Sequence, residues 1–272
     1  MTKHIVAIVS DLHPNSTVGL CPPLVNLDDG GTYKASRAQR WLWECWQDYA
    51  AKVKDTAGGA ETTTIFNGDL VEGDSKKRSN QIITRNRSTI LNIATETIAP
   101  LVDISTRALF IRGTSAHVGK SAELEEELAS DCTIAVHNDT TASWWNFYGV
   151  ISGVCFDIAH HGRLSNKPWN RPNALITHTF EKMLAYQKRG ERVPDVFIQS
   201  HNHKYGDTGG NLDSLGVACL AWQLQTEYSI RIATAEISDI GGLIFVIENG
   251  AYTWQKVQYK PKPRRPWVLK TS

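Results

Sequence analysis

The sequence of 272 residues has little of what marks membrane, secreted or strongly charged proteins. No apolar run approaches the roughly 18 residues of a membrane span. The apolar run near the N-terminus is short and is interrupted by Asp11, which does not fit a signal peptide. The net charge of +1 creates no overall field toward nucleic acid or a membrane surface. These absences predict a cytoplasmic protein without a membrane segment, and they leave its oligomeric state open.

Cysteine is also scarce, because the chain has five scattered cysteines and no Cys-x-x-Cys pair. An odd, scattered set disfavours a disulfide framework or a cysteine-bound zinc, and it favours reduced thiols. With 41% hydrophobic and 21% charged residues, the composition is that of a globular protein with a large core. We expect one domain over residues 1–259, followed by a basic, proline-rich tail over residues 260–272.

Apolar periodicity and turn residues predict an alternation of strands and helices. Strands are predicted at 4–10, 62–66, 107–112, two within 143–159, 195–199, near 215–222, 228–237, 243–248 and 251–259. Helices are predicted at 36–54, 80–101, 121–129 and 173–189, and a long loop at 14–33. Such alternation predicts parallel strands covered by helices, and the late hairpins predict a second, more antiparallel sheet.

Asp11 and His13 directly follow the first predicted strand. Residues i and i+2 of a strand face the same side, so both side chains can point at one spot beyond its carboxyl end. Ligands bind at this edge of open α/β sheets. A carboxylate oxygen and an imidazole nitrogen at one spot form half of a transition-metal site.

Four further predicted strands end in residues of the same kind. These are Asp69 after Gly68, His117 within Gly113-Thr114-Ser115-Ala116-His117, His160 beside His161, and His201 with His203. Each motif alone fits a turn or a helix cap as well as a metal site. Their coincidence at five strand ends favours a site for two metal ions.

In order and content these motifs resemble those of the calcineurin-like metallophosphoesterases, over residues 5 to about 205. The family pattern is D-x-H, G-D-x-x-D/N/E, G-N-H-D/E, a lone His and G-H-x-H. This chain has Asp11-Leu12-His13, Gly68-Asp69-Leu70-Val71-Glu72, Gly113-Thr114-Ser115-Ala116-His117, His160, and Ser200-His201-Asn202-His203. The resemblance implies an α/β fold, a four-layer αββα sandwich of two mixed sheets flanked by helices, with the metals at the carboxyl ends of the strands.

The resemblance also implies two divalent metal ions and a ligand set. Asp11, His13 and His203 would hold the first ion, His160 and His201 the second, and Asp69 would bridge them. His160 is preferred to His161 because it directly follows its strand. Such a set suits Mn, Fe, Ni and Zn alike.

One family ligand is missing, because Thr114 stands where the pattern has Asn. Either Thr114 or Ser115 substitutes, or water fills the place, or the loop brings His117 to the metals differently. The second ion would then bind less tightly. Ser200 replaces the glycine of the last motif, which is a milder change.

Hydrolysis of a phosphomonoester or phosphodiester by a metal-activated hydroxide is the reaction that the resemblance implies. His117 is the candidate for protonating the leaving oxygen, with a structural loop histidine as the alternative. Asp157 is either a hydrogen-bond partner of a ligand histidine or an exposed strand residue.

Basic and aromatic residues follow two of the motifs and point to the partner. Lys76, Lys77, Arg78, Arg85 and Arg87 follow Asp69, and Arg163, Lys167, Trp169 and Arg171 follow His160. They could contact phosphate and stack on a base, with Arg163 the best candidate, or they form a solvated helix face and a proline-rich loop. The expected partner is a phosphorylated small molecule or a nucleic acid. A nuclease is one alternative function, and a non-catalytic binding protein with a degraded metal site is the other.

Overall fold

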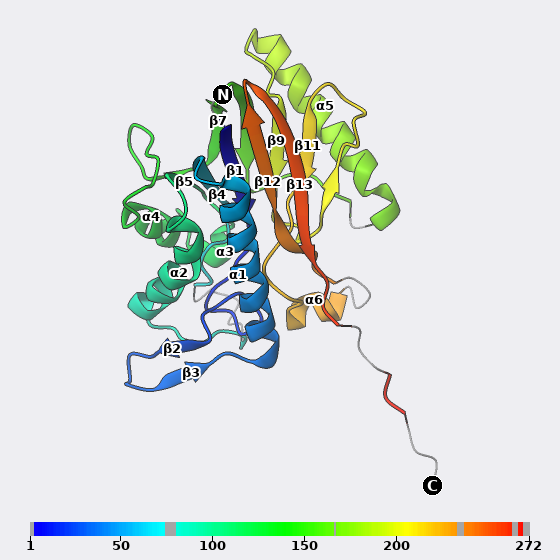
Figure 1. Cartoon of the computed structure of the whole chain (residues 1–272). Coiled ribbons are helices and arrows are strands. Elements are labelled where there is room, and N and C mark those ends of the chain that lie inside the picture. The colour runs from blue at the N-terminus through cyan, green and yellow to red at the C-terminus, as the bar shows by residue number, and fades with distance from the viewer. Residues whose placement is uncertain (1–2, 74–79, 166, 233–236, 263–265, 269–272) are drawn as a thin grey trace.

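A computed structural model describes residues 3–73, 80–165, 167–232, 237–262 and 266–268 (Figure 1). Its first sheet has six strands in the order β13-β12-β1-β4-β5-β6. Four of them run parallel: β1 (Lys3–Val9), β4 (Glu61–Asn67), β5 (Arg107–Ile111) and β6 (Ser143–Trp144). The hairpin of β12 (Ile240–Glu248) and β13 (Ala251–Tyr259) adds antiparallel strands beside β1. The sheet is therefore mixed.

The second sheet has five strands in the order β10-β11-β9-β8-β7. They are β7 (Asn146–Ile151), β8 (Val154–Ala159), β9 (Val196–Gln199), β10 (Gly206–Asp207) and β11 (Leu215–Ala218). The central strands β8, β9 and β11 are parallel, and both edge strands are antiparallel to their neighbours. This sheet is mixed too.

The two sheets lie face to face, because alternate side chains of their strands meet in one core. Val6 and Ile8 of β1 pack in the same buried cluster as Phe156, Ile158 and Ile198 of the second sheet. This inter-sheet cluster is completed by residues of β4, β5, β11 and β12. The predicted pairing of two mixed sheets is therefore confirmed.

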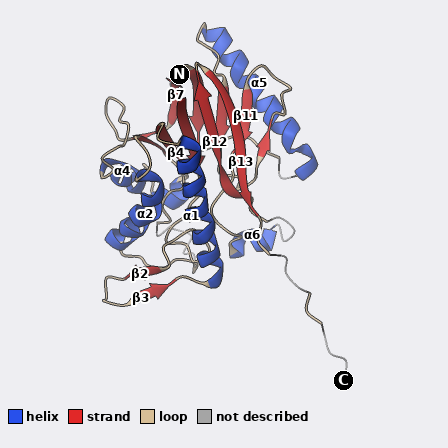
Figure 2. Ribbon diagram, viewed as in Figure 1, coloured by secondary structure: helices blue, strands red, loops and turns tan. Residues whose placement is uncertain are grey.

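Helices cover both outer faces, as Figure 2 shows. They are α1 (Arg37–Ala57), α2 (Arg87–Val102) and α4 (Glu123–Ser130) on the first sheet, and α5 (Arg171–Arg189) on the second. Ile5, Ala7 and Val9 of β1 pack against the first three helices, and Phe197 of β9 packs against Met183 of α5. The result is the four-layer αββα sandwich that the sequence predicts. None of the helices in the described ranges is long and apolar enough to cross a membrane.

Capping side chains set where the long helices begin. Ser36 and Gln39 form a reciprocal capping box at the start of α1. The Asn86 side chain accepts from the Thr89 N–H, so α2 begins at Arg87 and not near residue 80 as predicted.

Other predictions differ from the structure near residue 230 and in the last hairpin. Residues 228–232 of the strand predicted at 228–237 belong instead to α6 (Glu227–Ile232), where the Thr226 hydroxyl accepts from the Ser229 N–H, and residues 233–236 lie outside the described residues. The late hairpin extends the first sheet, while the second sheet is built from strands of the middle of the chain. The predicted loop 14–33 contains a small hairpin, β2 (Leu24–Asn26) and β3 (Thr32–Lys34).

Two short elements lie after strands of the core. They are α3 (Ser115–Val118), after β5, and the 3-10 helix η1 (Pro168–Asn170), between β8 and α5. The described residues of the basic tail, 260–262 and 266–268, form neither helix nor strand.

Candidate metal centre

The candidate ligands meet at the carboxyl ends of strands from both sheets. Asp11 and His13 follow β1, Asp69 follows β4, His160 follows β8, and His201 and His203 follow β9. Backbone hydrogen bonds join these loops, from the Asp11 N–H to the Gly68 carbonyl at 2.9 Å and from the His13 N–H to the Asp69 carbonyl at 3.0 Å. The six residues, far apart in sequence, therefore lie around one spot.

Five of these six residues have a left-handed backbone. Their φ angles are 53° at Asp11, 45° at His13, 53° at Asp69, 73° at His201 and 52° at His203. Non-glycine residues rarely adopt this conformation, and each instance costs about 1–3 kcal/mol. Such strain gathers at functional sites, where the surrounding structure holds side chains in an otherwise unfavourable direction.

The first group of possible ligands is Asp11, His13 and His203, whose ligand atoms all lie within 4.8 Å of one another. The Nε2 of His203 is 3.1 Å from Asp11 Oδ1, and the Nε2 of His13 is 3.9 Å from the same oxygen. Asp11 Oδ1 and His13 Nε2 are buried without a hydrogen bond among the described residues. A buried acceptor without a donor is costly, so an electropositive partner suits these atoms.

The second group is Asp11, Asp69, His160 and His201, again within 4.8 Å. The Nδ1 of His160 is 2.7 Å from the Asn67 carbonyl, and its Nε2 is 3.2 Å from Asp69 Oδ2. Asp69 Oδ2 is also 3.8 Å from His13 Nε2, so it lies between the two groups. Asp11 belongs to both groups, and the sequence-based assignment had placed it in the first alone.

The two carboxylates are ionised despite their burial. Burial raises the pKa of Asp11, but the neighbouring His203 and His160 outweigh it and hold the pKa well below its usual range. Burial likewise raises the pKa of Asp69, and His160 again holds it well below normal. Burial lowers the pKa of His160, but Asp69 and Asp11 raise it to about 10. The cluster therefore carries buried negative charge that a proton or a metal ion can balance.

Hydrogen bonds hold each carboxylate so that one oxygen stays directed at the imidazoles. Ser10 Oγ donates to Asp11 Oδ2 at 2.6 Å, and the Thr114 N–H donates to Asp69 Oδ1 at 2.6 Å. Gly113 makes the second contact possible, because a Cβ there would lie 2.2 Å from the Asp69 nitrogen. The remaining oxygens, Asp11 Oδ1 and Asp69 Oδ2, face the imidazoles.

Glu72 contacts two of the candidate site residues, and the sequence prediction gave it no role. Its carboxylate lies 2.8 Å from His13 Nδ1 and 3.0 Å from His117 Nδ1. Burial raises the pKa of Glu72, but hydrogen bonds with His117 and His13 lower it to about 2. The His13 bond fixes the tautomer in which Nε2 has a free lone pair directed at the cluster. The sequence did contain an indication of this role, because Glu72 is the last residue of the motif that begins with Gly68-Asp69.

His117 reaches the cluster in spite of the altered spacing of its motif. It lies in α3, and its ring meets that of His13 edge to face, with centroids 4.6 Å apart. Burial lowers the pKa of His117, but the hydrogen bond with Glu72 and the charge of Asp69 raise it to about 9. Its side chain is 31% exposed, so it lines the accessible side of the cluster.

Thr114 also lies at the cluster, beside the second group. Its hydroxyl is 3.0 Å from His201 Nδ1 and 3.4 Å from the Nε2 atoms of His160 and His161. Ser115 begins α3. Both histidines considered for one predicted ligand position therefore lie beside this hydroxyl, and His160 is buried whereas His161 is exposed.

Glu125 joins two of the ligand loops, and nothing in the motifs indicated it. Its carboxylate, fully buried in α4, accepts from the Leu70 N–H at 2.9 Å and from the Gly113 N–H at 2.6 Å. Leu70 directly follows Asp69, and Gly113 precedes Thr114. Burial and the charge of Asp69 raise the pKa of Glu125 to about 7, against the effect of the two donors.

Asp157 has neither of its two predicted roles. It is buried and accepts from Lys182 Nζ at 2.7 Å and from the Tyr186 hydroxyl at 2.8 Å, both in α5. Its side chain therefore stabilises the outer face of the second sheet. His160 Nδ1 faces the Asn67 carbonyl and not Asp157.

Several of the basic residues pair with exposed carboxylates or are themselves exposed. Arg163 is exposed and its guanidinium lies 2.9 Å from Glu181 of α5, while Arg87 pairs with Glu127. Lys76, Lys77 and Arg78 lie outside the described residues. Lys167 and Trp169 are exposed, and Trp169 belongs to η1.

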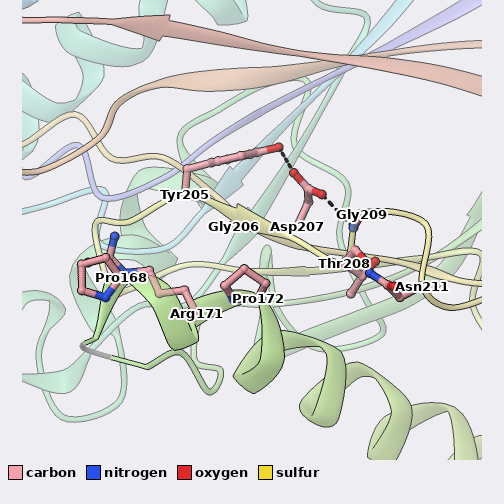
Figure 3. Close-up of a pocket in the computed structure, with 9 residues that line it drawn as sticks. All are labelled: Pro168, Arg171, Pro172, Tyr205, Gly206, Asp207, Thr208, Gly209 and Asn211. Atoms are coloured by element: carbon pink, nitrogen blue, oxygen red, sulfur yellow. Dashed lines mark hydrogen bonds between the residues drawn. The ribbon is translucent and has the colours of Figure 1, made fainter.

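A pocket of about 370 Å³ lies between the start of α5 and the segment around β10. Figure 3 shows Pro168, Arg171 and Pro172 on one wall, and Tyr205 and Asp207, joined by a hydrogen bond, on the other. The residues of the first wall come shortly after His160 in the sequence, and those of the second wall come directly after His203. Arg171 and Tyr205 are its candidates for contact with a bound molecule.

The donor set fits divalent ions. Imidazole and carboxylate ligands converge in two neighbouring groups, and the Nε2 atoms of His13 and His160 face carboxylate oxygens. Such nitrogen and oxygen ligands suit Mn, Fe, Ni and Zn alike.

No protein-family model and no curated protein sequence matches the chain. Among solved structures, a single mutant of Vps29 from Entamoeba histolytica matches 94% of this chain and 99% of its own, with TM-score 0.40 and 10% identity. A dimetal phosphatase of Danio rerio matches 94% and 99%, with TM-score 0.44 and 10% identity. A metallophosphoesterase of Sphaerobacter thermophilus matches 94% and 89%, with TM-score 0.34 and 10% identity. At such scores these likenesses assign neither a substrate nor a reaction to this chain.

Proposed function

We propose that this protein is a metal-dependent hydrolase of phosphomonoesters or phosphodiesters. The observation that carries the proposal is the convergence of buried Asp11, His13, Asp69 and His160 with half-buried His203 at the joined carboxyl ends of two sheets. A structural role alone does not account for buried acceptors without donors on a strained backbone.

The residues divide into two ligand sets. Asp11, His13 and His203 would hold one divalent ion, His160 and His201 the other, and the position of Asp69 suits a bridge between them. When bound, two such ions polarise the phosphoryl oxygens and lower the pKa of a coordinated water.

The protein itself supplies a positioned proton donor. Glu72 holds the Nδ1 of His117, which leaves Nε2 as the atom from which a proton can pass to the leaving oxygen. The same carboxylate holds His13, so one side chain orients a ligand and the acid together.

The substrate would be a phosphorylated small molecule or a nucleic acid. The pocket of Figure 3 suits the group attached to the phosphate, because both of its walls continue from ligand-bearing loops. Arg163 stays our candidate for a phosphate contact. Its present partner Glu181 is exposed, and an exposed ion pair contributes little, so a phosphate can compete for the guanidinium.

The test measures hydrolysis of an aryl phosphate and a bis-aryl phosphate by the full chain, stripped with a chelator and then supplied with Mn, Ni, Zn or Mg. We expect metal-dependent turnover, and a preference for the diester would favour the nuclease variant. Asp69→Asn should lower turnover by several orders of magnitude, because it removes the charge between the two ion positions.

Asp157→Asn is the matched control, since Asp157 is also a buried carboxylate but lies within β8 and bonds to α5. It should retain turnover under conditions where both variants are folded by circular dichroism. Absence of turnover and of bound metal in the unmodified protein would refute the proposal and favour a non-catalytic binding protein. Unchanged turnover in Asp69→Asn would refute the bridging role.

A further inference from the structure

We propose that His161 is a ligand of the second ion, in the place of the amide that the third motif lacks. This inference rests on the proposed function, since it concerns the same metal centre. Under it, His160 and His161 are not alternatives, and the second ion is held by both together with His201 and Asp69.

The geometry that carries it is a cluster of three imidazoles. One nitrogen from each of His160, His161 and His201 lies within 4.8 Å of the other two. The ring centroid of His161 is 5.0 Å from that of His160 and 4.9 Å from that of His201. His160 and His201 also belong to the group that contains Asp69 and Asp11. His161 therefore extends the second group on its exposed side.

The loop that bears His161 is packed in this position. Gly162 follows it, and a Cβ at residue 162 would lie 1.9 Å from the Gln199 side-chain oxygen, so only glycine allows this approach. Gln199 Nε2 donates to the Arg163 carbonyl at 2.9 Å, which ties the loop to β9 just before His201. The residues that follow His161 therefore hold its loop against β9, close to His201.

Thr114 is the competing candidate, and its contacts favour a different role. Its N–H already donates to Asp69, and its hydroxyl lies within 3.4 Å of nitrogen atoms of His160, His161 and His201. A neutral hydroxyl is a weaker ligand than imidazole for the transition metals that suit this site. The hydroxyl hydrogen-bonds with nitrogen atoms that an ion would otherwise occupy, so it competes with the ion and is not needed to hold it.

The two ions would then have unlike surroundings. Beside the bridging Asp69, the first has a carboxylate and two imidazoles from Asp11, His13 and His203, whereas the second has three imidazoles. Imidazole-rich sites favour Zn, Fe and Ni over Mg and Mn. The second position should therefore prefer Zn over Mn more strongly than the first.

The test is metal binding, measured without any substrate. The full-length protein is stripped with a chelator and titrated with Zn²⁺ or Mn²⁺ by calorimetry, and bound metal is counted by elemental analysis after desalting. The unmodified protein should bind two ions. His161→Ala should weaken the second ion at least tenfold, with loss of about one ion after desalting, while the first ion is unaffected.

Two control variants separate this role from others. His137→Ala removes an exposed histidine outside the cluster and should keep both ions. Thr114→Val should also keep both, because the hydroxyl is not a ligand. His161→Ala combined with Thr114→Asn should regain the second ion, because an amide oxygen then occupies the position of the family ligand. Circular dichroism and thermal melts of the stripped proteins confirm that all variants fold.

The outcomes distinguish this inference from the proposed function. Two ions with unchanged affinity in His161→Ala would overturn the role of His161 and leave the metal centre intact. Loss of the second ion in Thr114→Val, with retention in His161→Ala, would assign the ligand to Thr114 instead. Failure of the unmodified protein to bind any ion would overturn the proposed function itself.

Discussion

Replacing Glu125 with glutamine should destabilise the metal-free protein. The two carboxylate oxygens of Glu125 accept from the Leu70 and Gly113 N–H groups at 2.9 and 2.6 Å, and the residue is fully buried. A glutamine amide offers one oxygen and one NH₂ group. Whichever way it turns, one backbone N–H faces another donor and loses its partner.

The expected cost follows from that one donor. A buried N–H without an acceptor costs about 1–3 kcal/mol, and the neutral amide recovers part of this cost, because burial disfavours the charge that glutamine removes. We therefore expect the free energy of unfolding to fall by about 1–2 kcal/mol. Glu125→Ala would leave both donors unpaired and open a cavity, which threatens folding altogether.

The assay is urea unfolding of the chelator-treated protein at pH 8, above the pKa of about 7 for Glu125. The slope m should stay the same while the midpoint falls. The matched control is Glu127→Gln in the same helix, whose exposed pair with Arg87 is worth roughly 1 kcal/mol or less. If Glu125→Gln costs no more than this control, Glu125 does not hold the two ligand loops together.

Two further predictions concern residues away from the metal centre. Burial lowers the pKa of His4, and the nearby charges of Glu61, which raises it, and Arg107, which lowers it, have smaller effects. The folded state therefore favours the neutral imidazole. The stability that this gives is present above pH 6.5 and is lost as the pH falls. In His4→Gln the free energy of unfolding should decrease less between pH 6.5 and lower pH than in the unmodified protein. The measurement is the free energy of unfolding as a function of pH, and parallel curves for the two proteins would contradict the prediction. Asp157→Asn should leave metal stoichiometry unchanged but cost about 1–3 kcal/mol of stability, because its bonds to Lys182 and Tyr186 weaken. Loss of bound metal in that variant would place Asp157 in the site after all.

The strands and their ends could be predicted because the signals are local. A short apolar run followed by Asp or His, as at Val9 to His13, needs only strand periodicity and the rule that ligands gather at carboxyl ends. The structure brings those residues together as the motifs indicated. The strand predicted at 228–237 is wrong over 228–232, because Ile230 and Ile232 favour strands, whereas a Thr226 cap and an exposed surface favour a helical turn.

The supporting carboxylates could not be predicted, because their partners are distant in sequence. Glu125 belongs to an acidic helix, and in the sequence nothing distinguishes it from its neighbours Glu126 and Glu127. Only the packing of α4 shows that Glu125 faces the ligand loops. The prediction for Asp157 was wrong, because alternation along β8 places its side chain on the face of the second sheet that α5 covers.

The metal centre lies where the two sheets meet, and this position links ligand geometry to core packing. Asp11 and His13 come from the first sheet, whereas His203 and His160 come from the second. The distances between them therefore depend on how the sheets lie against each other, which the inter-sheet cluster of β1, β4, β5, β8 and β9 determines. A shift between the sheets would separate His203 from Asp11 before it disrupted either sheet. Bound ions would in turn stabilise this one relative arrangement, because ligands from both sheets are needed to hold them.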